Sequence, residues 1–338
     1  MLYSSYGPCT ISLLGLGIEM TKIRRLLKIT LRPTSECNRG CSDCYDDARI
    51  KENAIEFTED QQVALVDEIS TLIKKGVRML IHLTGGGEPL LYSRFVPLVE
   101  SLLNAGALVS FTTSGCSGLG SHQAVDFLNL SQVAEIRNKR LQPILSTKVT
   151  LPGWHDRFRF SEDLLGGING LVKVRRTHDR YGSKDAFATF LGDLGYRETD
   201  MDEISGVQLP PGFYRKDLIV PGQEESQTLY INERGMILQV ISHKTIKAGR
   251  AKRNNQVMAQ DATECPFLIG HEKPYLDIWP NGAIYPCFII GPEIPNLSLG
   301  NLGQTTLKEA LQNDNFEARK QRLRRGNLGD CLCDRCRG

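Results

Sequence analysis

Three of the ten cysteines lie close together in the chain, as Cys37, Cys41 and Cys44. A buried cysteine behaves as a small apolar residue, which accounts for isolated cysteines but not for three within one short polar segment. A disulfide framework would leave one of the three thiols unpaired, and the apolar run at 11–18 lacks the basic flank and cleavage site of a secretory signal. The spacing therefore indicates ligation of a metal or a cluster.

An iron–sulfur cluster fits this group better than zinc. Structural zinc takes four closed ligands, whereas the group offers three cysteines and no nearby histidine. A cluster held by three thiolates keeps one iron open to a further ligand, which implies chemistry as well as structure. Zinc remains the alternative.

A second group of cysteines lies near the C-terminus and comprises Cys265, Cys287, Cys331, Cys333 and Cys336. Residues 275–287 carry an Asn-Gly pair between two apolar stretches, which predicts a β-hairpin that ends at Cys287. A capping box over 306–309 predicts the start of a helix, and Gly326 predicts its end. On spacing alone, zinc is an alternative to an iron–sulfur cluster for this group.

Strands and helices alternate between the two groups. A strand at 26–32 leads into the first cysteines, and a strand at 78–84 leads into the glycine run 85–87 followed by Glu88. A helix at 59–75 lies between them, capped at Thr58 and carrying an apolar stripe. Its stripe is Val63, Val66, Ile69, Leu72 and Ile73.

Further strands are expected at 108–113, 142–150 and 171–174, with helices at 95–105 and 185–194. Repeated β/α units indicate a parallel sheet and favour a barrel, with function in the loops that follow the strands. Both the cysteine loop and the glycine loop directly follow a predicted strand. His82 lies inside a strand and is expected to be a hydrogen-bonded core residue.

The cysteine motif and the glycine motif together resemble the radical S-adenosylmethionine (SAM) superfamily, over about residues 26 to 116. The resemblance implies a partial (β/α)6 TIM-like barrel whose Cys37, Cys41 and Cys44 hold a [4Fe–4S] cluster that SAM chelates. It also implies that the loop formed by Gly85, Gly86, Gly87 and Glu88 contacts the SAM amino group. Asp43 departs from the apolar residue usual before the third cysteine, so Tyr45 is expected to pack near adenine instead. Ser146, at the end of a strand, is a candidate for polar contacts with SAM.

The C-terminal region resembles the SPASM/twitch extensions of these enzymes, a small cysteine-rich α+β domain. Gly282-x4-Cys287 and Cys333-x2-Cys336 match the shorter, twitch form, which implies one auxiliary [4Fe–4S] cluster. Cys331 is surplus and could replace Cys333. The expected organisation is an N-terminal extension (1–25), the barrel (26–246), a basic polar linker (247–259) and the cluster domain (260–338).

The resemblance implies an oxidoreductase or maturase that cleaves SAM to a 5′-deoxyadenosyl radical and removes a hydrogen atom from its substrate. An auxiliary cluster favours net oxidation, either dehydrogenation of a small metabolite or modification of a ribosomal peptide or protein. Expected partners are that substrate and an electron donor such as flavodoxin or ferredoxin. A net charge of +2 and no long apolar run predict a cytoplasmic protein with neither membrane nor nucleic acid as partner. The alternative is a non-catalytic iron–sulfur or zinc module that binds a protein or nucleic acid.

Overall fold

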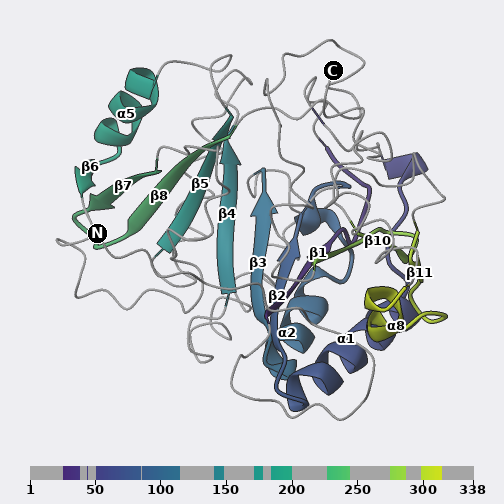
Figure 1. The fold of residues 1–338 in the computed structure, drawn as a ribbon. Coiled ribbons are helices and arrows are strands. Elements are labelled where there is room, and N and C mark those ends of the chain that lie inside the picture. Colours follow the sequence, from purple (N-terminus) through teal and green to yellow (C-terminus); the bar gives the residue numbers. More distant parts are fainter. Residues whose placement is uncertain are drawn as a thin grey trace, which may run out of the picture.

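The strands that the structure describes form one mixed sheet of eleven strands, in the order β11-β10-β9-β1-β2-β3-β4-β5-β8-β7-β6 (Figure 1). The computed structural model describes residues 26–38, 44, 51–84, 86–114, 141–147, 171–177, 184–199, 227–243, 275–286 and 298–313. Its strands are β1 (Leu26–Leu31), β2 (Arg78–Leu83), β3 (Leu108–Thr113), β4 (Leu141–Thr147), β5 (Leu171–Thr177), β6 (Tyr196–Thr199), β7 (Gln227–Asn232), β8 (Ile237–His243), β9 (Tyr275–Ile278), β10 (Ala283–Tyr285) and β11 (Gly300–Asn301). Its helices are α1 (Glu59–Lys74), α2 (Phe95–Ala105), α5 (Lys184–Asp193) and α8 (Leu307–Leu311), with 3-10 turns η1 (Lys51–Asn53) and η2 (Pro89–Leu91).

The predicted α/β class with a parallel sheet is confirmed. Strands β1, β2, β3, β4, β5 and β8 pair in parallel, each with the next. The sheet ends in two edge strands, β11 and β6, so within the described residues it is a partial rather than a closed barrel. In Figure 1, α1 and α2 lie together beside β1–β3, while α5 lies at the other end beside β6.

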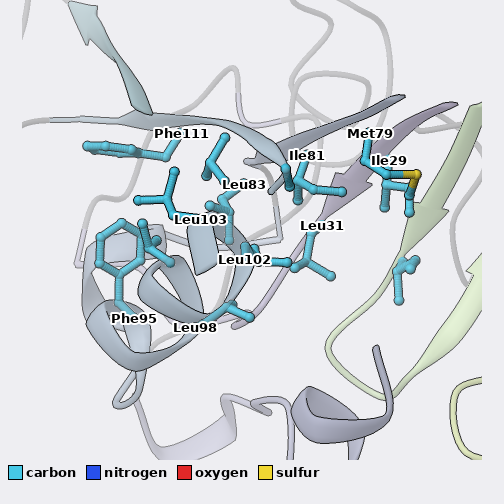
Figure 2. Close-up of a cluster of buried hydrophobic side chains, with 14 of the residues drawn as sticks. Ile29, Leu31, Met79, Ile81, Leu83, Phe95, Leu98, Leu102, Leu103 and Phe111 are labelled. Carbon is cyan, nitrogen blue, oxygen red and sulfur yellow. The ribbon is translucent and has the colours of Figure 1, made fainter. Parts of the chain in front are cut away.

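The main core lies between the first three strands and α2 (Figure 2). Alternate positions of each strand face the helices, and α2 contributes a stripe at helical spacing. The side chains that meet there include Ile29, Leu31, Met79, Ile81, Leu83, Phe95, Leu98, Leu102, Leu103 and Phe111. The rings of Phe95 and Phe111 meet edge to face, with centroids 5.3 Å apart. This packing fixes the ends of β1, β2 and β3, from which the cysteine loop and the glycine loop emerge.

Helix α1 begins as predicted, because the Thr58 hydroxyl accepts from the Gln61 amide and the Gln61 side chain accepts from the Thr58 amide. The predicted apolar stripe was wrong at Val63, which is 52% exposed. Ile69 is buried as predicted, and Val66, Leu72 and Ile73 are partly buried against the core. Gln62 and Leu65, which lie outside the predicted stripe, are buried as well. Gln62 takes a core position because its side-chain oxygen accepts a 2.9 Å hydrogen bond from the Tyr92 hydroxyl.

The predicted C-terminal hairpin is confirmed as β9 and β10, which pair antiparallel. A turn over 279–282 joins them, closed by a 2.8 Å hydrogen bond from the Gly282 amide to the Trp279 carbonyl. Strand β9 also pairs in parallel with β1, so the hairpin extends the sheet of the barrel. Helix α8 begins at the predicted Thr306 capping box but ends at Leu311; Gly326 lies outside the described residues.

Candidate functional site: the cysteine and glycine loops

The loop that carries the first cysteines is pinched at its base. The Ser35 amide donates to the Ile55 carbonyl, the Phe57 amide donates to the Pro33 carbonyl, and Thr34 forms an isolated bridge with Glu56. Both hydrogen bonds measure 2.9 Å. The chain between these anchors leaves β1 and returns to the start of α1, so the loop emerges from the strand end as expected.

Two of the three predicted ligands lie on the described part of this loop, Cys37 and Cys44, and both are half-buried. Cys41 and the predicted adenine contact Tyr45 lie outside the described residues. Among the residues that the structure describes, no group of three or more His, Cys, Asp and Glu side chains is placed to hold a metal. Cys37 directly follows segment 33–36, whose hydrogen bonds anchor the start of the loop.

The glycine loop packs against the backbone of the cysteine loop. The Glu88 amide donates a 2.7 Å hydrogen bond to the Glu36 carbonyl. A Cβ on Gly87 would overlap the backbone of Glu36, and one on Gly86 would lie 2.8 Å from the Thr34 carbonyl oxygen. Only glycine permits an approach this close. The structure therefore brings Gly86, Gly87 and Glu88 to the residue that precedes Cys37; Gly85 lies outside the described residues.

The carboxylate of Glu88 is buried and bonded to the end of β3. Its Oε2 atom accepts from both the amide and the hydroxyl of Ser114, at 2.7 and 2.6 Å. Its Oε1 atom accepts a longer, 3.4 Å hydrogen bond from the Leu90 amide. Glu88 is 5% exposed, so it joins the glycine loop to the loop that follows β3. An ammonium ligand would share this carboxylate with Ser114.

A line of polar side chains crosses β2 and β3 on the face opposite the apolar core. His82 is 9% exposed and lies between two hydroxyl groups. Its Nδ1 atom is 2.7 Å from Ser110 Oγ, and its Nε2 atom is 3.2 Å from Thr112 Oγ1. Both ring nitrogens thus have side-chain partners, as expected for a core histidine. Ser146, the other polar candidate, lies in β4 in register with Arg175 of β5.

Arg32, directly after β1, forms a fully buried ion pair with Asp277 of β9. Arg32 Nε donates to Asp277 Oδ1 at 3.1 Å, and Arg32 Nη2 lies 3.0 Å from Asp277 Oδ2. The indole nitrogen of Trp279 donates a further 2.7 Å hydrogen bond to Oδ2. Burial raises the pKa of Asp277, and the charge and hydrogen bonds of Arg32 oppose that shift.

The C-terminal elements also dock on α1. The Leu307 amide, at the start of α8, donates to Glu68 Oε2, and burial raises the pKa of this carboxyl group. A Cβ on Gly282 of the hairpin turn would overlap the side chain of Gln61. Figure 1 shows α8 beside α1 at this end of the sheet. The C-terminal elements thus contact β1 and α1, the two elements that flank the cysteine loop.

Residues 270–337 match the family model of the iron–sulfur cluster-binding domain called SPASM. The C-terminus therefore carries a SPASM-type domain. This confirms the resemblance drawn for the C-terminal cysteines and the class of cofactor predicted for them. Cys265, which precedes the match, and Cys287, Cys331, Cys333 and Cys336, which lie within it, are all outside the described residues. The described elements of this SPASM segment are β9, β10, β11 and α8.

Solved structures with distant similarity cover most of the chain. BtrN in complex with AdoMet and 2-DOIA has 17% identity and a TM-score of 0.45, with 91% of each chain covered. Streptococcus suis SuiB bound to precursor peptide SuiA has 13% identity and a TM-score of 0.48, covering 86% of this chain and 66% of SuiB. Native anSMEcpe with bound AdoMet and Cp18Cys peptide has 11% identity and a TM-score of 0.48, covering 86% of this chain and 81% of anSMEcpe. A search of curated proteins found no match.

Three residues of this region were not singled out from the sequence: Arg32, Ser114 and Asp277. A charged residue inside an otherwise apolar strand, such as Asp277 between Leu276 and Ile278, is a usable signal, because a buried charge requires a partner. Arg32 gives the same signal at the end of an apolar strand. Nothing in the sequence pairs the two, since they are 245 residues apart.

Proposed function

We propose that this protein is a radical SAM enzyme with a SPASM-type auxiliary domain. The observation that carries the proposal is the contact of Gly87 and Glu88 with the backbone of Glu36, directly before Cys37. This contact joins the two motifs on which the resemblance rests. The match of residues 270–337 supports the proposal independently, at the other end of the chain.

The residues present fit the two groups that this activity requires. Cys37 and Cys44 are soft thiol donors on one loop, together with Cys41 of the same motif. The absence of a Cβ at Gly87 lets the glycine loop lie against the backbone of Glu36, and the buried Glu88 carboxylate offers an acceptor for an ammonium group. When bound, a [4Fe–4S] cluster on these cysteines supplies the electron that cleaves SAM to methionine and a 5′-deoxyadenosyl radical.

The chain's own contribution is binding, orientation and exclusion of water. Glu88, buried and already oriented by Ser114, accepts a hydrogen bond from the SAM ammonium group. Tyr45 is the proposed contact for adenine, and Ser146 is the candidate for a polar contact with SAM. The hydrogen bonds at the base of the cysteine loop fix the segment that directly precedes Cys37.

We further propose that the reaction is a net oxidation. The cysteines of the SPASM segment would hold a second cluster, which would accept an electron from the substrate radical left after removal of a hydrogen atom. A small metabolite and a ribosomal peptide or protein are both suitable substrates. A flavodoxin or ferredoxin would supply the first electron, which points to a cytoplasmic setting.

Anaerobic reconstitution tests this function. The protein is loaded with iron and sulfide, given dithionite and SAM, and assayed for 5′-deoxyadenosine. We expect production by the wild type, none by the triple variant Cys37→Ala/Cys41→Ala/Cys44→Ala, and unchanged production by the control Cys9→Ala, which lies outside both cysteine groups. Zinc instead of iron, or iron without SAM cleavage in the presence of candidate substrates, would favour a binding module for a protein or nucleic acid.

A further inference from the structure

Arg32 lies where the cysteine loop, the glycine loop and the SPASM segment meet. It follows the last residue of β1, lies five residues before Cys37 in sequence, and is completely buried. Its backbone amide donates a 2.9 Å hydrogen bond to the Ile278 carbonyl, which continues the pairing of β1 with β9. Backbone and side chain of Arg32 therefore both contact the SPASM segment.

The side-chain contacts with the SPASM segment fix the direction of the guanidinium group. Asp277 accepts two parallel contacts from Arg32, the fork geometry that specifies orientation as well as distance. The ring of Trp279 lies 4.3 Å from Arg32 Cζ, and the indole N–H is bonded to the same carboxylate. Three side chains thus hold one another in a single arrangement.

The other side of Arg32 supports the glycine loop. A Cβ on Gly86 would lie 3.3 Å from Arg32 Cβ and 3.7 Å from Arg32 Cδ, so the loop rests on the aliphatic part of this side chain. Directly before the loop, the Thr84 amide donates a 3.0 Å hydrogen bond to the Leu31 carbonyl. Any displacement of the Arg32 side chain therefore displaces the surface on which Gly86 lies.

Joining the end of β1 to β9 does not by itself require a buried ion pair such as Arg32–Asp277. Two apolar side chains of similar volume would join the strands at no desolvation cost, whereas a buried ion pair is often no more stable than its apolar replacement. What the pair adds is a defined geometry. We propose that Arg32 is a positioning residue. It fixes the position of the glycine loop relative to the SPASM segment. The inference rests on the proposed function only in assigning SAM to that loop.

Hydrogen exchange of the reconstituted full-length protein tests this role. The peptide to follow contains residues 84–92, because the Glu88 amide in it is bonded to the Glu36 carbonyl. Asp277→Asn breaks the charged pair without changing its size. We expect about tenfold faster exchange of this peptide and a similar loss of SAM affinity, the effect of one lost charge-assisted hydrogen bond. Trp279→Phe, which removes the indole donor but keeps an aromatic ring, should act in the same direction by about threefold.

Glu68→Gln is the matched control, because Glu68 also joins the barrel to the SPASM segment but contacts Leu307, away from Arg32. It should leave exchange of peptide 84–92 and SAM affinity within about twofold of the wild type. Equal acceleration in the control and in the Asp277 and Trp279 variants, or none in those variants, would overturn the proposal. Trp279→Phe alone decides the question if Asp277→Asn does not fold. If the wild type makes no 5′-deoxyadenosine but exchange still responds to Asp277 and Trp279 alone, the proposed function fails and the positioning role stands.

Discussion

The Glu88 amide and the Glu36 carbonyl are joined by a 2.7 Å hydrogen bond, although 52 residues separate them in sequence. The bond ties the glycine loop after β2 to the cysteine loop after β1. Because β1 and β2 are parallel neighbours, both loops emerge at the same edge of the sheet. The two motifs therefore form one structural unit, and a change in either should disturb the other.

Gly87→Ala should disrupt the contact between the glycine loop and the cysteine loop. The added Cβ would overlap the Glu36 backbone, so the cysteine loop must shift. We expect 5′-deoxyadenosine production to fall by about a hundredfold, the effect of misplacing reacting groups by about 1 Å. The control is Gly192→Ala in α5, where an added Cβ meets nothing within 4 Å. Normal activity in Gly87→Ala would mean that this contact does not matter for the site.

Glu88 and Ser114 allow a structural role to be separated from a ligand-binding role. Glu88→Gln removes the negative charge proposed to face the SAM ammonium, so SAM should bind about ten- to a hundredfold more weakly by calorimetry. Ser114→Ala removes only the hydroxyl donor and should change SAM affinity less than about threefold. Equal affinities of both variants would show that Glu88 merely fastens the end of β3.

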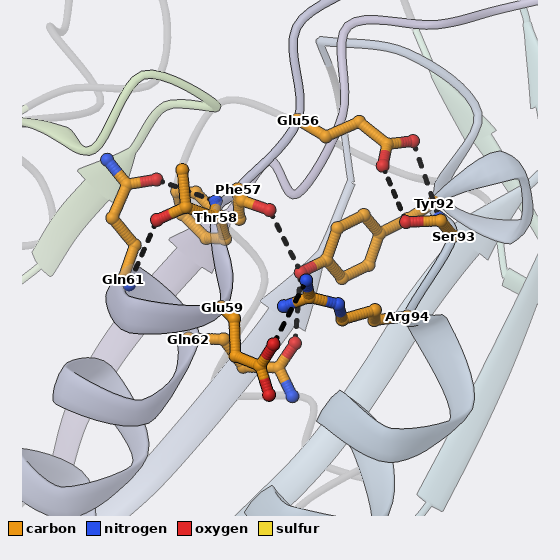
Figure 3. A network of polar contacts seen from close by, with 9 residues as sticks. All are labelled: Glu56, Phe57, Thr58, Glu59, Gln61, Gln62, Tyr92, Ser93 and Arg94. Carbon is orange, nitrogen blue, oxygen red and sulfur yellow. Dashed lines mark hydrogen bonds and ion pairs between the residues drawn. The ribbon is translucent and has the colours of Figure 1, made fainter.

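Tyr92, whose hydroxyl lies among polar contacts with Gln62 and Phe57 (Figure 3), should titrate far above an ordinary tyrosine. Burial raises its pKa to about 12, and the nearby charge of Arg94 opposes the shift. Its hydroxyl donates to Gln62 Oε1 at 2.9 Å. Between pH 10 and 12 the folded protein keeps a proton that the unfolded chain has released, so the free energy of unfolding falls as pH rises through this window.

Denaturant unfolding of the wild type and of Tyr92→Phe at pH 8, 10 and 11 measures this contribution. The variant should be less stable at pH 8 by about 1 kcal/mol, because the hydrogen bond to Gln62 is lost. The difference should shrink toward pH 11, since phenylalanine does not titrate. A difference that stays constant with pH would contradict the raised pKa.

The buried Arg32–Asp277 pair should show strong coupling in a double-mutant cycle. Arg32→Met or Asp277→Leu alone leaves one charge buried without its partner and should lower the free energy of unfolding by about 3–5 kcal/mol. The double variant removes both charges and should lose less than half of that. Arg94→Gln is the control, because its 3.3 Å ion pair with Glu59 is not buried like the Arg32–Asp277 pair and contributes less than about 1 kcal/mol. Additive losses would contradict a mutually stabilised pair.

Much of the chemistry was readable from the sequence because it depends on residue type and local spacing. Three cysteines on one loop, a glycine run after a strand and a capping box at Thr58 are all local patterns. Apolar periodicity reflects which face of an element is buried, and so it predicted the strands and helices. Their alternation along the chain then predicted the parallel sheet. The same reasoning failed at Val63, because the local pattern does not show that Tyr92 holds Gln62 in the core.

The tertiary structure alone decided how the two ends of the chain meet. The sequence predicted the hairpin of β9 and β10 but not its pairing with β1, because register between distant strands depends on packing and not on local preference. Arg32 and Asp277 are each only a charged residue near an apolar strand until that pairing brings them together. Burial then requires that each charge have a partner, and so only the fold determined that the cysteine loop, the glycine loop and the SPASM segment share one junction.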